Sequence, residues 1–341
     1  MQECKFVTVC TENIRVEDEE SISTNKKEIH ILKKEKKENY KLNASVHTLE
    51  VKSEYPTIQN EKNDYITTRI SQDGKIGTSK INPNKYDGDI FNFTEFEETM
   101  ENILTESQID EYRITRADLR FDNYKRSHYK AYAKLNKYII SALMVTYKVK
   151  NKYRTVDLVT GDQLTIAIKN DYFEVENYDR DVKNKVTGNT TEPAKARLEE
   201  RTMAKQWRKI RGGLVYTGNE ENLELLKEEF TSGWEERWKK AKSNLKLVQE
   251  VYNEALQKKY YDGLNARPVQ FRTLTDFLIQ NQDSIFTSMQ MVDLLKRLGV
   301  SNPESRAKYH KKKYGIEYFS KSDVEYAIKE IQRATQQYFS S

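Results

Sequence analysis

The sequence has few cysteines and histidines, and it contains no long apolar run. Its 341 residues include 2 Cys and 4 His, and the cysteines, Cys4 and Cys10, have no histidine cluster near them. A structural zinc site is therefore not expected, and isolated thiols suit a reducing cytoplasm. No stretch approaches the length that spans a membrane, and no signal peptide opens the chain. The sequence predicts a soluble, cytoplasmic protein without a membrane partner.

Glycine and proline are also scarce, with 12 and 5 residues, whereas charged residues make up 33% of the chain. The 22 Tyr, 12 Phe and 3 Trp supply enough core to exclude a disordered chain. The net charge of +5 is mild, so charge alone does not indicate a nucleic-acid partner. A chain of this length can hold two domains.

The order of the expected elements indicates an α+β protein, with helices packed on an antiparallel sheet. One helix is expected from Thr94, where Glu97 would complete a capping box, and another from about residue 127 to 145. Asp73-Gly74 predicts a hairpin turn, and 160–162 a second turn. Strands are expected where residues alternate or are β-branched, at 5–10, 28–32, 42–51, 65–70, 75–81, 112–122, 153–159, 164–168, 172–178 and 194–201.

The part after residue 201 is expected to be helical. The stretch 219–260 predicts two helices broken at Ser232-Gly233, with Trp234 and Trp238 in the core. Further helices are expected from Leu274, up to a stop at Gly299, from 302 to 313, and after a cap at Ser320.

The segment 112–122 alternates with a period of two and has one apolar and one charged side. On an edge strand these charges would only be solvated. In a central strand they would have to line a polar cleft, because burying them unpaired costs several kcal/mol each. The apolar side carries Thr115, Ala117, Leu119 and Phe121, and the charged side carries Arg116, Asp118, Arg120 and Asp122.

Two later segments repeat this pattern. Tyr172, Glu174, Glu176 and Tyr178 share one side of the first, and Arg197, Glu199 and Arg201 share one side of the second. If these sides lie on one face of the sheet, they suit metal-assisted phosphodiester chemistry. Carboxylates can hold Mg²⁺ or Mn²⁺, a tyrosine can act as nucleophile, and arginines can neutralise phosphate charge. The alternative is a solvent-facing side crossed by ion pairs.

Four short motifs, in this order, carry a resemblance to a known family. They are Asn82-Pro83-Asn84-Lys85-Tyr86-Asp87-Gly88, Ile114-Thr115-Arg116-Ala117-Asp118-Leu119-Arg120-Phe121-Asp122, Tyr178-Asp179-Arg180 and Arg197-Leu198-Glu199. Over roughly residues 40–215 the chain resembles the Rep_trans, or replication initiation factor, group. This group contains rolling-circle replication initiators of Gram-positive plasmids and filamentous phages, and related relaxases. In that family an α+β catalytic domain nicks one DNA strand at an origin, and a tyrosine becomes joined to the 5′ phosphate in a metal-dependent reaction.

The resemblance implies a set of site residues. Tyr178 would be the nucleophile, with Tyr172 and Tyr216 as rivals. Arg180 replaces the usual lysine, and the segment between Tyr178 and Arg197 is long. A pair of histidines flanking one hydrophobic residue is missing, which excludes the two-histidine metal site of other rolling-circle nucleases. Asp118, Asp122 and Glu199 would bind Mg²⁺ or Mn²⁺, while Arg116, Arg120 and Arg197 would act on the phosphate.

Basic residues predict DNA contacts in two regions. The first is a run with an interleaved Trp207, for which a solvated helix is the alternative. The second follows a short helix and a tight turn, as in a helix-turn-helix, with His310 as a phosphate contact or surface residue. A helical packing or dimerisation unit is the alternative there. The predicted contacts are Arg201, Lys205, Arg208, Lys209, Arg306, Lys308, Lys311, Lys312 and Lys313.

These observations together predict a nicking and joining domain at 1–215, a helical connector at 216–268 and a helical DNA-binding domain at 269–341. The expected activity is rolling-circle initiation at an origin, with duplex and single-stranded origin DNA as partners. A host helicase and a second copy of the chain are further candidate partners. The alternatives are a non-catalytic DNA-binding regulator or theta-type initiator, and a relaxase for conjugative transfer.

Overall fold

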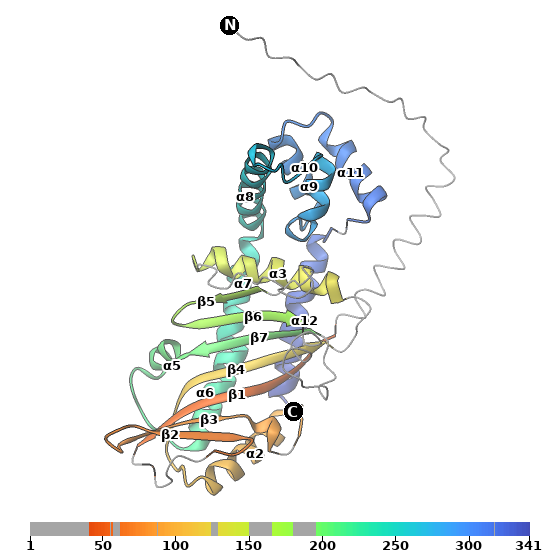
Figure 1. Ribbon diagram of the computed structural model, residues 1–341. Helices are drawn as coiled ribbons and strands as arrows, with labels where there is room; N and C mark the ends of the chain where they lie inside the picture. Colours follow the sequence, from red (N-terminus) through yellow and green to blue (C-terminus); the bar gives the residue numbers. More distant parts are fainter. Residues whose placement is uncertain are drawn as a thin grey trace. The chain divides into compact units, whose positions relative to one another are not determined.

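The computed structural model describes residues 41–54, 56, 62–86, 88–123, 129–149, 166–179, 196–316 and 318–341 (Figure 1). The strands expected at 5–10, 28–32 and 153–159 and the turn at 160–162 lie outside these residues. So do Cys4, Cys10, Asp87 and Arg180.

The strands of the described residues form one antiparallel sheet of seven strands, in the order β2-β3-β1-β4-β7-β6-β5. The strand with alternating charges, β4, is therefore central. The predicted hairpin is confirmed, because Gly74 takes a φ of 71° and its N–H donates to the Ser71 carbonyl at 2.9 Å. The strands are β1 (Asn43–Glu54), β2 (Ile66–Ile70), β3 (Ile76–Ile81), β4 (Arg113–Asn123), β5 (Ile166–Lys169), β6 (Phe173–Asp179) and β7 (Ala196–Met203).

The helices confirm the predicted α+β class. Between the strands lie α2 (Phe93–Glu106), which precedes β4, and α3 (Tyr129–Thr146), which precedes β5. After β7 come α5 (Ala204–Arg211), α6 (Asn219–Glu228), the π turn η3 (Glu229–Gly233), α7 (Trp234–Ser243), α8 (Leu245–Asn265), α9 (Leu274–Gln280), α10 (Ser288–Arg297), α11 (Pro303–Tyr314) and α12 (Lys321–Phe339). No helix within the described ranges is long and apolar enough to cross a lipid bilayer.

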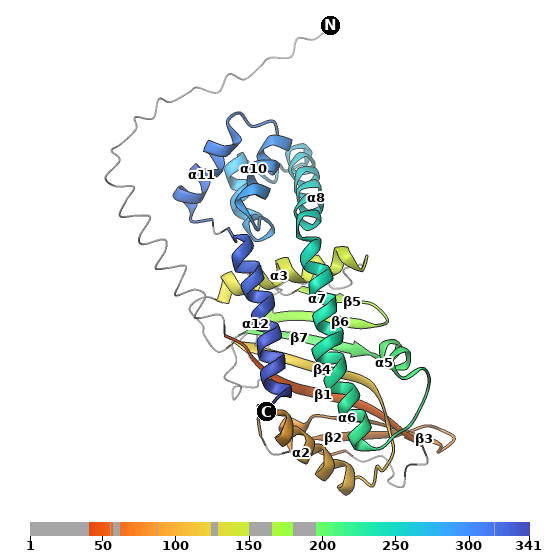
Figure 2. The same cartoon turned by 180° about the vertical axis from the view of Figure 1, so that it is seen from behind.

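Helices α7 and α12 cover the apolar face of the sheet, behind it in Figure 1 and in front of it in Figure 2. Two tryptophans of α7 join the layers. The Nε1–H of Trp234 donates to the Thr202 hydroxyl at 3.0 Å, and that of Trp238 donates to Glu200 Oε1 at 2.5 Å. Both side chains are buried, so their predicted place in the core is confirmed.

The sequence predicted a break at Ser232-Gly233 in the helical stretch after residue 219, and this prediction is wrong. The stretch continues through η3 and is interrupted at Asn244 instead. Gly233 is needed for close approach, since a Cβ there would lie 2.5 Å from Glu229 Oε2. That carboxylate is buried and accepts a hydrogen bond from Arg237 at 2.5 Å.

The start of α2 also differs from the prediction. The helix begins at Phe93, and its cap is Asn92, whose side chain accepts the Glu95 N–H at 2.8 Å. An Asx side chain just before the helix outcompetes the predicted cap at Thr94 because it lies where the first free N–H groups point.

The C-terminal helices divide between two apolar cores. The second half of α8 packs with α9, α10 and α11 through Leu256, Phe277 and Leu294. The final helix, α12, packs with the sheet instead, and Glu330 accepts the Leu42 N–H at 3.0 Å. The helices after residue 269 therefore contribute to both cores.

Candidate active site

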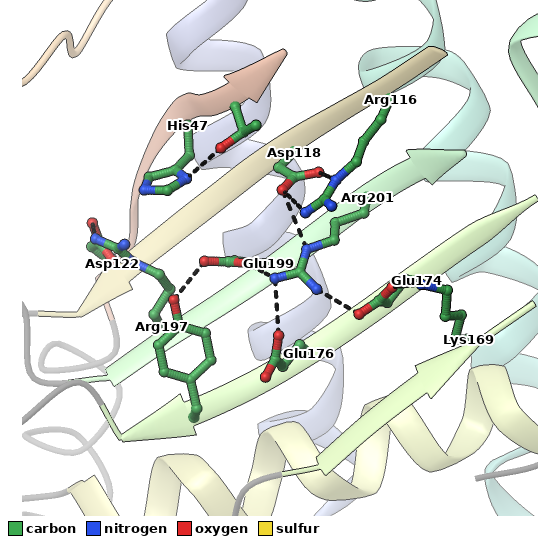
Figure 3. Close-up of polar contacts among 12 residues, drawn as sticks. His47, Arg116, Asp118, Asp122, Lys169, Glu174, Glu176, Arg197, Glu199 and Arg201 are labelled. Carbon is green, nitrogen blue, oxygen red and sulfur yellow. Dashed lines mark hydrogen bonds and ion pairs between the residues drawn. The ribbon is translucent and has the colours of Figure 1, made fainter. Parts of the chain in front are cut away.

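The register of the strands places the charged sides of β4, β7 and β6 on one face of the sheet (Figure 3). Residues that lie directly opposite one another across strands point to the same side. The predicted shared face is therefore confirmed. Its three rows are Asp118–Arg201–Glu174, Arg120–Glu199–Glu176 and Asp122–Arg197–Tyr178, and we call these residues, together with Arg116, the polar floor.

A bidentate pair between Arg197 and Asp122 anchors one end of the floor. The Nε and Nη2 atoms of Arg197 donate to Asp122 Oδ1 at 2.6 Å and Oδ2 at 2.9 Å. Arg120 adds a second cation, with its Nε 3.4 Å from Asp122 Oδ2. Burial opposes the charge of Arg197, but the Asp122 carboxylate outweighs it and raises the pKa of Arg197 above its usual value.

Arg201 lies at the centre of the floor and contacts four carboxylates. Its Nη1 donates to Glu174 at 2.5 Å and its Nη2 to Glu176 at 2.9 Å, while Nη2 also donates to Glu199. Its Nε lies 3.3 Å from Asp118 Oδ2. Asp118 is held from its other side by Arg116, through contacts of 2.7 and 2.5 Å.

Tyr178 meets the floor through Glu199. Its hydroxyl donates to Glu199 Oε1 at 2.5 Å, and its ring is buried, with 4% of its surface exposed. Burial tends to raise the pKa of Glu199, but Arg201, His47, the Tyr178 hydroxyl and Arg197 together lower it to about 2. Glu199 is thus a carboxylate at neutral pH and accepts the phenolic hydrogen.

His47 lies at the site, although the predicted set of site residues did not include it. The pairs Val46↔Leu119 and Thr48↔Asp118 leave His47 as an extra residue in β1, so the strand has a bulge there. The imidazole lies beside the floor, on the neighbouring strand β1, with Nδ1 3.0 Å from the Thr48 hydroxyl (Figure 3). Two consecutive polar residues between Val46 and Leu49 interrupt the alternation, and this was the available signal.

The predicted metal ligands are engaged by arginines. Asp118 is held by Arg116, Asp122 by Arg197, and Glu199 by Arg201. Among the residues that the structure describes, no three Asp, Glu, His or Cys side chains are grouped so that they could hold a metal ion. This arrangement does not fit Mg²⁺ or Mn²⁺, which need oxygen atoms that converge on one point.

The predicted DNA contacts fall into two exposed sets and one exception. Lys205, Arg208 and Lys209 are exposed on α5, and all the named cations of α11 are exposed as well. The exception is Arg201, which belongs to the floor. Trp207 is buried and donates to the Thr202 carbonyl at 3.0 Å, so it is not an exposed aromatic among the cations. His310 is also buried, and the prediction that it is a surface residue is wrong.

An open hollow of about 440 Å³ lies beside α5. Tyr172, with 44% of its surface exposed, lines it together with Lys205, Arg208 and Lys209. Tyr172 lies just before β6 and is not part of the three rows of the floor. The other rival nucleophile, Tyr216, has the Arg113 guanidinium 5.4 Å from its ring centre.

Comparisons with known proteins give little beyond this geometry. No family model matches the chain, and no curated protein matches it. The chain is similar to the solved structure of a rolling-circle replication initiator protein from Geobacillus stearothermophilus. The similar region covers 50% of this chain and 78% of the Geobacillus chain. The identity is 14% and the TM-score is 0.27.

Proposed function

We propose that the protein is a rolling-circle replication initiator that nicks and rejoins one DNA strand, with Tyr178 as its nucleophile. One observation carries the proposal. The Tyr178 hydroxyl donates to an ionised carboxylate, Glu199, within a floor that also holds Arg197 and Arg201. A nucleophile within hydrogen-bond reach of an acceptor, next to cations, is the arrangement that covalent catalysis on a phosphate requires.

The reaction is a transesterification that needs no other reactant. The phenolic oxygen of Tyr178 attacks a backbone phosphorus, and the bond between that phosphorus and the 3′ oxygen breaks. The phenolic proton passes to the released 3′ oxygen, so that a free 3′ hydroxyl and a tyrosine–5′-phosphate ester result. The reverse reaction joins the strand again.

Glu199 orients the phenol rather than holding its proton. Its pKa of about 2 lies about eight units below the ordinary pKa of a phenol, so proton transfer to it is strongly unfavourable. The phenolate character that develops during attack must be stabilised by cations instead. Arg197 lies directly opposite Tyr178 in the register and is the nearest candidate for this role.

The path of the strand would follow the exposed cations. The hollow beside α5 combines the exposed ring of Tyr172 with Lys205, Arg208 and Lys209. A cationic groove with one aromatic ring suits single-stranded DNA, because bases stack on the ring while the cations meet the phosphates. The exposed cations of α11 would bind duplex origin DNA through its backbone.

The test is the covalent adduct. Wild-type protein is incubated with negatively supercoiled DNA of the replicon that carries its gene, with and without Mn²⁺, and nicked circles and protein–DNA adducts are measured. Tyr178→Phe should form neither, because it lacks the attacking oxygen. Its fold should persist, since the change removes one hydrogen bond to a charged group, worth about 1.5–3 kcal/mol.

Tyr172→Phe and Tyr216→Phe are the matched controls, since each removes a hydroxyl from a rival position. Both should retain nicking. An adduct peptide that contains Tyr172 or Tyr216, or an adduct formed by Tyr178→Phe, would contradict the assignment. Digestion of the adduct and mass measurement of the DNA-linked peptide decide between them.

A non-catalytic DNA-binding regulator or theta-type initiator is the second candidate. The observation that favours it is the pairing of Asp118, Asp122 and Glu199 with arginines, since a structural network of ion pairs needs no substrate. Such a protein would bind the same DNA without nicking it. A relaxase for conjugative transfer would use the same chemistry and would differ in its DNA site.

A further inference from the structure

We propose that Arg201 is the resident cation of the polar floor and occupies the place at which a divalent ion would meet Asp118 and Glu199. Both carboxylates were predicted as metal ligands, and both contact this one guanidinium. Glu174 and Glu176 complete its surroundings, with contacts of 2.5 and 2.9 Å. Three strands, β4, β6 and β7, thus bring four carboxylates to one arginine.

The shape of the cluster fits a guanidinium better than an ion. Its carboxylates meet different atoms, Asp118 the Nε, Glu174 the Nη1, and the remaining two the Nη2. Glu174, Glu176 and Glu199 accept hydrogen bonds from the two Nη atoms, whereas Asp118 makes an ion-pair contact at 3.3 Å with Nε. The oxygens are therefore spread around a planar fork and do not converge on one point. Mg²⁺ instead needs oxygen atoms at about 2.0–2.1 Å from one centre in an octahedral arrangement.

The register explains why a cation is needed at this position. Glu199 and Glu176 lie directly opposite each other on β7 and β6. Like charges in that position destabilise a sheet. The Nη2 of Arg201 donates to both carboxylates and so bridges the pair. The guanidinium is also shielded, with 12% of its side chain exposed, so water competes little for these contacts.

The other cations nearby do not replace Arg201. Arg116 holds only Asp118 among the four acids, and Lys169 Nζ reaches Glu174 at 2.9 Å. Loss of Arg201 would therefore leave an excess of negative charge around a space the size of its head group. Carboxylate oxygens around such a space are the ligands that Mn²⁺ or Mg²⁺ takes.

A catalytic consequence follows, and it rests on the proposed function. If Tyr178 nicks DNA, Arg201 supplies the positive charge beside Glu199, and nicking should proceed in the presence of EDTA. The binding of metal to the floor does not depend on that function and is tested separately.

The test is Mn²⁺ binding, measured from the electron paramagnetic resonance signal of the free ion in titrations of the full chain. Wild-type protein should show no specific Mn²⁺ site at the floor. Arg201→Met should gain a site that binds Mn²⁺ at least about tenfold more tightly than the nonspecific binding of wild-type protein, which corresponds to about 1.4 kcal/mol. Adding Glu199→Gln to Arg201→Met should abolish that gain.

Two matched variants isolate the position and the charge. Arg116→Met removes the other guanidinium that holds Asp118, and Arg201→Lys keeps a positive charge at the centre. Neither should gain Mn²⁺ affinity. If Arg201→Met does not fold by circular dichroism, Arg201→Gln, which keeps an amide donor, carries the comparison.

Two results would overturn the inference. One is a single Mn²⁺ site in wild-type protein that Asp118→Asn abolishes, because Arg201 would then yield to the ion. The other is a folded Arg201 variant without any gain in affinity. Failure of the proposed function looks different, since no nicking under any condition leaves both Mn²⁺ results unchanged.

Discussion

The stability of an Asp122→Asn variant distinguishes two roles for Asp122, a structural partner of Arg197 and a metal ligand. Asp122 and Arg197 are buried, and two hydrogen bonds of 2.6 and 2.9 Å join them. Removing one partner of a buried ion pair leaves an uncompensated charge and typically costs about 3–5 kcal/mol of folding free energy. Glu199 also stabilises the charge of Arg197, so we expect the lower end, about 3 kcal/mol.

The assay is urea unfolding in the presence of EDTA, with the unfolding free energy extrapolated to water. Asp89→Asn is the matched control, because Asp89 pairs with Arg120 at 2.6 Å but has 39% of its side chain exposed. It should cost less than Asp122→Asn, because the Asp89 carboxylate reaches water and the buried Arg120 keeps Asp122 Oδ2 3.4 Å from its Nε. The double variant Asp122→Asn/Arg197→Met should recover part of the loss, since it removes both charges.

A cost of Asp122→Asn no larger than that of Asp89→Asn would refute a structural role for the Asp122 carboxylate. A gain in stability on Asp122→Asn would point to a metal ligand, because a carboxylate kept for an ion repels its neighbours when the ion is removed. The two roles therefore predict changes of opposite sign in the same experiment.

Three further predictions concern the rest of the molecule. Burial raises the pKa of Glu200 to about 8. The folded state therefore keeps a proton that the unfolded chain has already released above about pH 4.5. Between these two pH values the free energy of unfolding should fall as pH rises, by up to about 1.4 kcal/mol per pH unit. Glu200→Gln should remove that slope in urea unfolding, and an unchanged slope would place the proton elsewhere. Lys311→Gln with Lys312→Gln should weaken duplex DNA binding and reduce its salt dependence without changing the circular dichroism spectrum, whereas unchanged binding would leave α11 as a packing helix. Gly263→Ala should destabilise the protein by about 1–3 kcal/mol, because the added Cβ would lie 2.3 Å from the Phe271 ring, and a neutral effect would mean that the ring can move freely.

The sheet was predictable because its pattern is strictly local. Alternation along β4 and β7 assigns each side chain to a face without any knowledge of the neighbours. Apolar spacing and caps likewise located the C-terminal helices, including the Ser320–Asp323 capping box of α12. These features depend on residues that are close in sequence.

The partners within the floor were not predictable in the same way. Alternation put Asp118 and Arg201 on one face, but only the register between β4 and β7 makes them direct neighbours. The family resemblance implied that Asp118, Asp122 and Glu199 bind a metal, whereas the three-dimensional arrangement supplies an arginine to each of them. The return of α12 to the sheet was also hidden, since its apolar stripe does not say which layer it covers.

The arginines of the floor also explain how β7 keeps its register. Glu199 and Glu200 are adjacent in sequence and lie on opposite faces of the sheet. Glu199 is ionised beside Arg201, whereas burial under Trp238 raises the pKa of Glu200 to about 8. The helix-facing side of β7 is poor in apolar residues, since Leu198 shares it with Glu200 and Thr202.

Hydrophobic pattern alone therefore specifies this strand weakly. A slip by one residue would turn Arg197 and Arg201 toward the tryptophans of α7, away from their carboxylates, at a cost of several kcal/mol each. The ion pairs thus select the one register in which Tyr178 lies opposite Arg197 and reaches Glu199. A network that adds little net stability can in this way still determine where the candidate nucleophile lies.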